Sequence, residues 1–149
     1  MSTNRMRQDI DDLEVFVGLW GITASFTPPG VAPPAAETSF EWLEGRHVLV
    51  QRWHVDHPDA PDGIAIVGID NESGRCRQHF FDSRGEARIY EMSFKDGVWK
   101  LWRDHPGFSQ RFTGTFDESG DVITGTFELS RDGTTWERDF DTTYTRLRA

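Results

Sequence analysis

The feature that most constrains this chain is a hydrophobic period of two, which runs from Leu19 almost to the C-terminus in segments joined by short connections. This period is typical of strands with one buried face. Parallel pairing would need crossovers of a dozen or more residues, which these connections cannot supply. The pattern predicts an all-β, ten-stranded antiparallel up-and-down barrel, closed so that no edge is left. The expected strands are 19–26, 37–43, 46–55, 63–70, 75–82, 87–95, 98–104, 108–116, 121–129 and 134–147.

A helical period precedes the first strand. Ile10, Leu13 and Phe16 recur at helical spacing, Asp9 can cap the turn and Gly18 can end it. We therefore expect a short helix over 9–17 that plugs one end of the barrel. At 149 residues the chain fits one domain, 1–149, which is large enough to fold without a disulfide or a metal.

The connections between the expected strands are of two kinds. Tight turns rich in Gly, Asn and Asp follow every second strand, at 44–45, 71–74, 96–97 and 117–120. Longer, proline-containing connections follow three of the other strands, at 27–36, 56–62 and 104–107. Because alternate connections of a meander lie at opposite ends, one end should be tightly closed and the other should carry loose loops. We expect the loose-loop end to be the mouth of a binding cavity.

Aromatic residues make up 13% of the chain, and alternation turns most of them inward. Three polar residues share that inner face, namely Arg103, Gln110 and Arg138. An arginine inside a barrel needs a carboxylate, carbonyl groups or water. Arg103 and Arg138 could bind an anionic head group while aromatic side chains hold an apolar body. Alternatively, they pair with nearby carboxylates such as Asp82, or extend to the rim.

The leading hypothesis is a lipocalin-like barrel that binds a small, mainly apolar ligand carrying an anionic or hydrogen-bonding group. For the strands 46–55, 63–70 and 75–82, the sequence does not decide which face points inward, because both faces are partly apolar. The candidate ligand-binding residues are Arg103, Arg138, Gln110, Tyr90, His54, His79 and Trp53.

Two other functions are compatible with the same barrel. The cavity could hold an enzyme of the cyclase, isomerase or decarboxylase type, with His54 or His79 as acid or base beside Asp82 or Glu91. No serine nucleophile elbow, phosphate-binding loop or dinucleotide fingerprint occurs in the sequence. The third hypothesis is a filled barrel that serves as an interaction or dimerisation module.

Metal and thiol chemistry have weak sequence support. His54 and His57 stand three residues apart, so an extended strand points them to opposite faces, and we expect no metal site and no cofactor. Cys76 lies between Arg75 and Arg77, which would lower the pKa of its thiol if it were exposed, although burial is the alternative.

Charge and hydropathy limit the partners. The net charge is −9 and no basic patch is present, so we expect no nucleic acid partner. No apolar run is long enough for a signal peptide or a membrane span, and the single cysteine suits a reducing compartment. These features favour a cytoplasmic protein that does not bind membranes, with a small molecule as partner and a homodimer as a candidate assembly.

Two motifs at the chain ends resemble the calycins, the superfamily of lipocalins and fatty-acid-binding proteins. Gly18-Leu19-Trp20 after a short helix is similar to their G-x-W signature. The resemblance implies that a basic residue of the last strand packs across Trp20 at the closed end. Arg146 lies at the closed end of the last strand, and alternation places it on the required face, with Arg148 as the alternative.

The whole chain also resembles a family of uncharacterised bacterial β-barrels catalogued as a domain of unknown function. The resembling stretches are 16–20, 45–51, 68–74, 81–85 and the closing 144–146. Fatty-acid-binding proteins hold carboxylates with interior arginines, which parallels Arg103 and Arg138. Nitrobindins, a related ten-stranded group, bind haem through a histidine late in the chain. This sequence has no histidine after His105, so haem is not expected.

Overall fold

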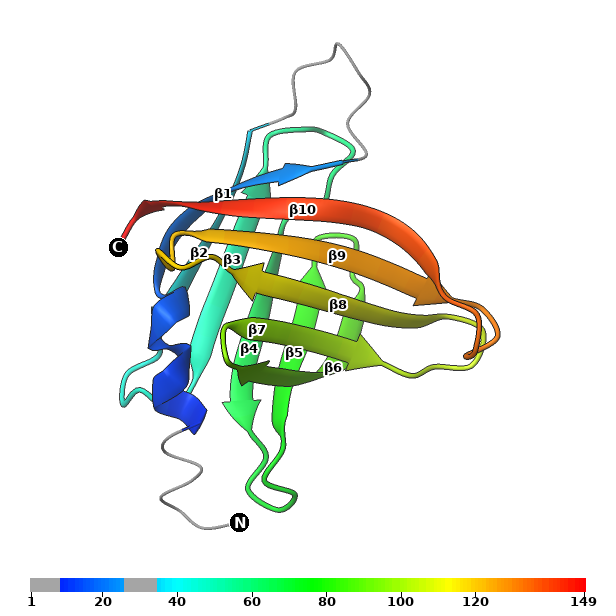
Figure 1. Cartoon of the computed structure of the whole chain (residues 1–149), viewed down its shortest axis with the longest axis horizontal. Helices are drawn as coiled ribbons and strands as arrows, with labels where there is room; N and C mark the ends of the chain where they lie inside the picture. The colour runs from blue at the N-terminus through cyan, green and yellow to red at the C-terminus, as the bar shows by residue number, and fades with distance from the viewer. Residues whose placement is uncertain (1–8, 26–34) are drawn as a thin grey trace.

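The fold is a closed antiparallel β-barrel, seen in a computed structural model that describes residues 9–25 and 35–149. Each strand pairs with its neighbours in sequence, and β1 pairs with β10 to close the barrel (Figure 1). The strands are β1 (Gly18–Ala24), β2 (Ala36–Trp42), β3 (Leu49–Val55), β4 (Gly63–Ile69), β5 (Cys76–Asp82), β6 (Ala87–Lys95), β7 (Val98–Arg103), β8 (Ser109–Phe116), β9 (Val122–Ser130) and β10 (Glu137–Arg148). The predicted fold class and all ten strands are confirmed.

Two strands, β3 and β10, begin three residues later than predicted, for local reasons. Before β3 the chain turns through Arg46, which has a left-handed φ of 58°, so pairing starts only at Leu49. Before β10 the carboxylate of Asp132 accepts the backbone N–H groups of Thr134 and Thr135 at 2.8 and 2.7 Å. These bonds hold 134–135 in a turn, which is a common use of aspartate.

A short helix over 9–16 lies at one end of the barrel and includes the 3-10 helix η1 (Asp12–Phe16) (Figure 1). It ends in a tight turn because the Val17 N–H donates to Glu14 O at 3.0 Å, a spacing of three residues. The Glu14 carboxylate in turn accepts hydrogen bonds from Trp42 and from Arg46, the latter at 3.1 Å. The helix predicted at 9–17 is thus confirmed, and it is fastened to the turn between β2 and β3.

Arg146 closes the same end from the last strand. It pairs with Trp20 in the β1–β10 ladder, and its guanidinium carbon lies 4.2 Å from the centroid of the buried indole. Its guanidinium donates to Val17 O at 2.6 Å, Val15 O at 2.7 Å and Asp121 Oδ1 at 2.8 Å. The expected packing of Arg146 against Trp20 is confirmed, and it joins the helix, β1 and the start of β9.

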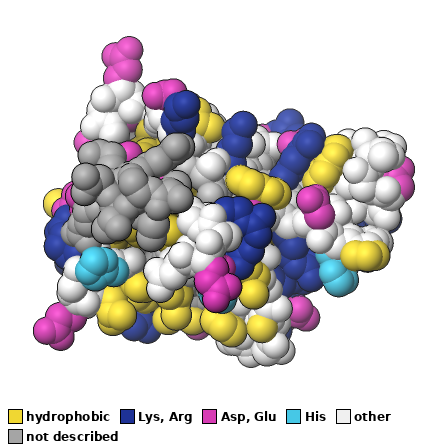
Figure 2. Space-filling view, turned by 90° about the horizontal axis from the view of Figure 1, so that it is seen from below, with side chains coloured by type: hydrophobic (Ala, Val, Ile, Leu, Met, Phe, Trp, Pro, Cys, Tyr) yellow, Lys and Arg dark blue, Asp and Glu magenta, His cyan; other side chains and the backbone are white. Residues whose placement is uncertain are grey.

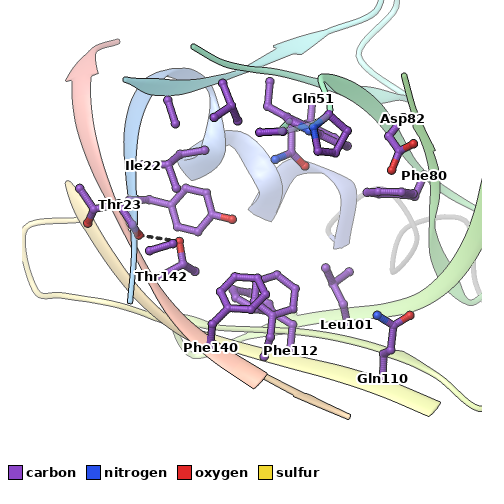
Figure 3. Close-up of a pocket in the computed structure, with 18 of the residues that line it drawn as sticks. Ile22, Thr23, Gln51, Phe80, Asp82, Leu101, Gln110, Phe112, Phe140 and Thr142 are labelled. Atoms are coloured by element: carbon purple, nitrogen blue, oxygen red, sulfur yellow. Dashed lines mark hydrogen bonds between the residues drawn. The ribbon is translucent and has the colours of Figure 1, made fainter. Parts of the chain in front are cut away.

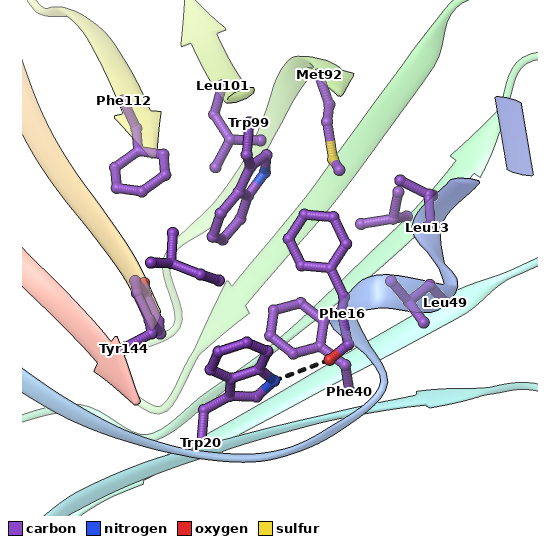
Figure 4. Packing of buried hydrophobic residues seen from close by; sticks show 12 residues of the cluster. Leu13, Phe16, Trp20, Phe40, Leu49, Met92, Trp99, Leu101, Phe112 and Tyr144 are labelled. Atoms are coloured by element: carbon purple, nitrogen blue, oxygen red, sulfur yellow. Dashed lines mark hydrogen bonds between the residues drawn. The ribbon is translucent and has the colours of Figure 1, made fainter. Parts of the chain in front are cut away.

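The hydrophobic core is centred on Phe16, which the helix inserts into the barrel (Figure 4). Its ring, which is completely buried, has four aromatic neighbours. They are Phe40 at 5.2 Å, Phe94 at 5.1 Å, Trp99 at 5.0 Å and Phe116 at 5.1 Å between ring centroids. Most of these contacts are edge-to-face, the arrangement that aromatic rings favour. The barrel interior is therefore solid at the end where the helix packs.

The outer face of the barrel carries charges of both signs. Figure 2 shows one side of the molecule, where basic and acidic side chains lie among one another. Some pair across neighbouring strands, as Arg77 does with Glu91 and Arg111 with Glu128, each at 2.9 Å. Both pairs are only partly buried, and ion pairs at the surface contribute about 1 kcal/mol or less each. Among residues 9–25 and 35–149, no helix is long and apolar enough to cross a membrane.

Candidate functional site

The half of the barrel away from the helix encloses a cavity of about 780 Å³. This volume lies within the range of small-molecule sites. In the close-up, Phe112 and Phe140 stand on one side of the cavity, with Gln51 and Phe80 across from them (Figure 3). The large apolar side chains of the lining are Ile22, Trp53, Phe80, Tyr90, Trp99, Leu101, Phe112, Phe127, Phe140 and Tyr144.

The mouth of the cavity lies at the end with the longer connections. Its described rim includes Ala24 and Ala36, the β3–β4 connection from Val55 to Pro61, and the pair Asp82 and Arg84. This placement agrees with the mouth expected from the proline-containing connections. Phe26 and most of the connection 27–36 lie outside the described residues.

The structure resolves the inner face of β3 to β5. Gln51, Trp53 and Val55 face inward from β3, and Gln78 and Phe80 face inward from β5. The sequence left these strands open because their outer faces also carry large apolar side chains. An example is Phe81 on β5, which is exposed.

Three of the predicted ligand-binding residues line the cavity together. They are Trp53, Tyr90 and Gln110. The Gln110 Oε1 atom accepts a hydrogen bond from Tyr90 Oη at 3.0 Å and another from Arg88 Nη1 at 3.2 Å. Trp53 stacks on Phe80 with ring centroids 5.3 Å apart. Tyr90 and Gln110 thus form a polar part of the cavity wall, and Trp53 with Phe80 forms an aromatic part.

The two arginines predicted to face the cavity are not among its lining residues. Arg138 pairs with Glu128 in the β9–β10 ladder, carries an ion pair to Asp141 and is 64% exposed. The predicted inward orientation of Arg138 is wrong, because the β-bulge between Arg138 and Phe140 reverses the faces. Arg103, at the end of β7, lies opposite Gln110 in the β7–β8 ladder.

The candidate acid–base groups are dispersed. His54 points outward and bonds to Asp62 at 2.9 Å, and His79 is exposed on the outside of β5. Glu91 lies on the outside of β6, bound to two arginines. Asp82 does line the cavity, but Arg84 Nη2 donates to it at 2.7 Å, and this bond keeps the pKa of the Asp82 carboxyl below its ordinary value. The geometry provides no histidine–carboxylate pair inside the barrel.

The structure also places the residues considered for metal binding and thiol chemistry. His57 lines the mouth while His54 points outward, so the pair splits as an extended strand dictates. No cluster of three or more His, Cys, Asp or Glu able to hold a metal occurs in the described ranges. Burial raises the pKa of the Cys76 thiol to about 12. The neighbouring arginines, Arg75 and Arg77, point away to Glu91, so they do not lower it.

The lining residues that were not predicted from the sequence include two buried amides. Gln51 and Gln78 are 6% and 4% exposed, and both line the cavity. Each is an uncharged amide in an otherwise apolar strand face, which is a recognisable signal once the face is known. The sequence alone could not use this signal, because it does not decide which face of β3, β4 and β5 points inward.

Comparison with known proteins supports the fold alone. No known family model matches the chain, and no curated protein matches it in sequence. The crystal structure of Rv2717c from M. tuberculosis is similar, with a TM-score of 0.61 over 94% of this chain and 98% of that chain, at 14% identity. The two proteins share a barrel architecture. Neither family resemblance noted above is confirmed, and both stay predictions.

Proposed function

We propose that this protein binds a small, mainly apolar molecule with a hydrogen-bonding group inside the barrel. The observation that carries this proposal is the cavity of about 780 Å³ with aromatic walls and a mouth at the loose-loop end. Burial of apolar ligand surface against such walls supplies the main part of the binding free energy, at roughly 25 cal/mol per Å². The polar groups in the lining would then fix the ligand's orientation.

The charges at the mouth favour an uncharged ligand over an anion. Asp56 and Asp59 lie at the rim, and the nearby Arg84 is already paired with Asp82 at 2.7 Å. The chain as a whole carries a net charge of −9, which also repels anions. The anionic head group expected for Arg103 and Arg138 therefore has less support than a neutral one.

The other two hypotheses have less support from the geometry. An enzyme of the kind considered above needs a cavity-facing acid or base. His54, His79 and Glu91 lie on the outside, and Asp82, which does line the cavity, is already paired with Arg84. A filled barrel would leave no cavity, whereas this interior holds about 780 Å³. Formation of a homodimer stays a prediction, for which sedimentation velocity is the test.

Binding can be tested with Nile red, an uncharged dye that fluoresces strongly in apolar surroundings. We expect saturable binding with a stoichiometry of one dye per barrel. Ala36→Trp narrows the mouth and should weaken binding roughly tenfold, equivalent to about 1.4 kcal/mol. Fluorescence titration gives the affinities.

The matched control is Ala87→Trp, because Ala87 also begins a strand but is exposed on the outside of β6. This variant should bind Nile red as the unmodified protein does. Absence of saturable binding, or equal weakening by both substitutions, would show that the dye does not enter through the mouth and would contradict the proposal.

A further inference from the structure

The polar atoms deep in the cavity define the ligand's hydrogen-bonding group more closely. We infer that Gln51 and Gln78 form a subsite for an uncharged amide-type group, such as a carboxamide, lactam or imide. This inference rests on the proposed function, and it assigns the chemistry of the ligand within the same cavity. It stands on three observations, which concern the two side chains and the wall opposite them.

Gln78 is a buried amide without a partner. Its residue is 4% exposed, and it lines the cavity from β5. Among the described residues no hydrogen bond reaches its side chain, whose amide offers two donors and an acceptor. Its amide atoms are accessible from the cavity, since the fully buried side-chain atom without a partner in the described ranges is Trp99 Nε1. A buried polar group normally has a partner, because leaving it unpaired is costly. The partner of Gln78 must therefore come from the cavity.

Gln51 presents a fixed acceptor on the same wall. Its Nε2 donates to Thr38 Oγ1 at 3.1 Å, and the Thr38 hydroxyl donates its proton to Arg52 O at 3.0 Å. Since that proton is already used, Thr38 can only accept from Gln51, and the Gln51 amide must point its nitrogen at Thr38. Its Oε1 is left to accept a hydrogen bond from a ligand.

The two amides are placed to contact one ligand. Gln51 pairs with Ala65 and Gln78 pairs with Val67, so both flank β4 on its inner face, one pleat apart. Neighbouring strands are separated by about 4.8 Å, so β3 and β5 are about 10 Å apart. Figure 3 shows Phe112 and Phe140 across the cavity from Gln51. An aromatic body would pack on that phenyl wall and direct its polar edge at the amides.

The chemistry of the pair selects a neutral group with both a donor and an acceptor. A carboxylate could accept from Gln78, but it would be repelled by the Gln51 oxygen. An ammonium could donate to Gln51, but it would lose its hydration, and the lining carboxylate of Asp82 is already paired with Arg84 at 2.7 Å. An amide donates to Gln51 and accepts from Gln78, so it satisfies both.

The test uses three competitors with the same apolar body: 2-naphthamide, 2-naphthoate and 2-methylnaphthalene, each displacing Nile red. We expect the amide to bind about tenfold more tightly than either of the others, the effect of one or two neutral hydrogen bonds. Gln78→Met should remove this preference and leave the affinity for 2-methylnaphthalene unchanged. Because no protein hydrogen bond is lost, its melting temperature should be equal or higher.

The control variant is Asn71→Met, which removes an exposed amide in the turn after β4, outside the cavity, and it should keep the ranking of the three competitors. If Nile red fails to bind, the proposed function and this inference both fall. If the dye binds and the three competitors displace it equally, or the carboxylate is strongest, the proposed function stands and the amide subsite is wrong. An equal loss of amide affinity in Gln78→Met and Asn71→Met would also overturn the subsite.

Discussion

Replacing Arg146 with methionine is expected to lower the free energy of unfolding by about 3 kcal/mol, because it leaves several carbonyl acceptors without their charged hydrogen-bond donor. The guanidinium of Arg146 is largely buried over Trp20 and bonds to Asp121 and two carbonyls of the N-terminal segment. Methionine fills much of the volume but leaves those acceptors without donors. Urea denaturation followed by tryptophan fluorescence gives the change.

Arg148 provides the control, since it lies two residues further along β10 and is exposed. Arg148→Met should change stability by no more than about 0.5 kcal/mol. Arg146→Lys should fall between the two, because lysine keeps the charge but cannot form the branched set of bonds that arginine makes. Equal losses for Arg146→Met and Arg148→Met would mean that the contact with Trp20 adds nothing specific.

The barrel itself could be predicted from the sequence because its turns and its alternation agree. Gly45, Gly74, Gly97 and Gly120 each take a positive φ in a turn between strands, as the sequence of those turns requires. Such turns are too short for any crossover, so antiparallel pairing of successive strands follows. The Trp20–Arg146 contact was expected on a different ground, the resemblance of Gly18-Leu19-Trp20 to the calycin signature.

The faces of individual residues were harder to predict, and Arg138 shows why. Alternation indicates only which residues of a strand share a face. One inserted residue therefore moves every residue beyond it to the opposite face. The bulge before Phe140 does this, and nothing in the local sequence, Glu-Arg-Asp-Phe, marks it.

The candidate site was partly missed for a related reason. Gln51 and Gln78 lie on strands whose outer faces are also apolar, as Phe81 shows by being 43% exposed. Hydrophobic patterning locates a buried face only where the other face is polar. The polar residues that line this cavity could therefore be identified only once the register of β3, β4 and β5 was known.

Phe16→Ala is expected to cost about 3 to 5 kcal/mol, the usual range for truncating a buried phenylalanine. The ring is enclosed by four aromatic neighbours at 5.0 to 5.2 Å, which cannot all move in to fill the space. Val15→Ala is the control on the same helix, because Val15 is only partly buried, and it should cost about 1 kcal/mol. Thermal unfolding measures both.

The same variant tests whether the closed end is separate from the cavity. The void left by Phe16 would be lined by apolar side chains, four of them aromatic, and apolar voids stay empty and accept benzene. Benzene should therefore raise the melting temperature of Phe16→Ala more than that of the unmodified protein, since a ligand stabilises only the folded state that binds it. Adding Ala36→Trp, which narrows the mouth, should not reduce this extra stabilisation. If it does, the void is continuous with the ligand cavity, and the helix would be part of the binding site as well as the barrel's plug.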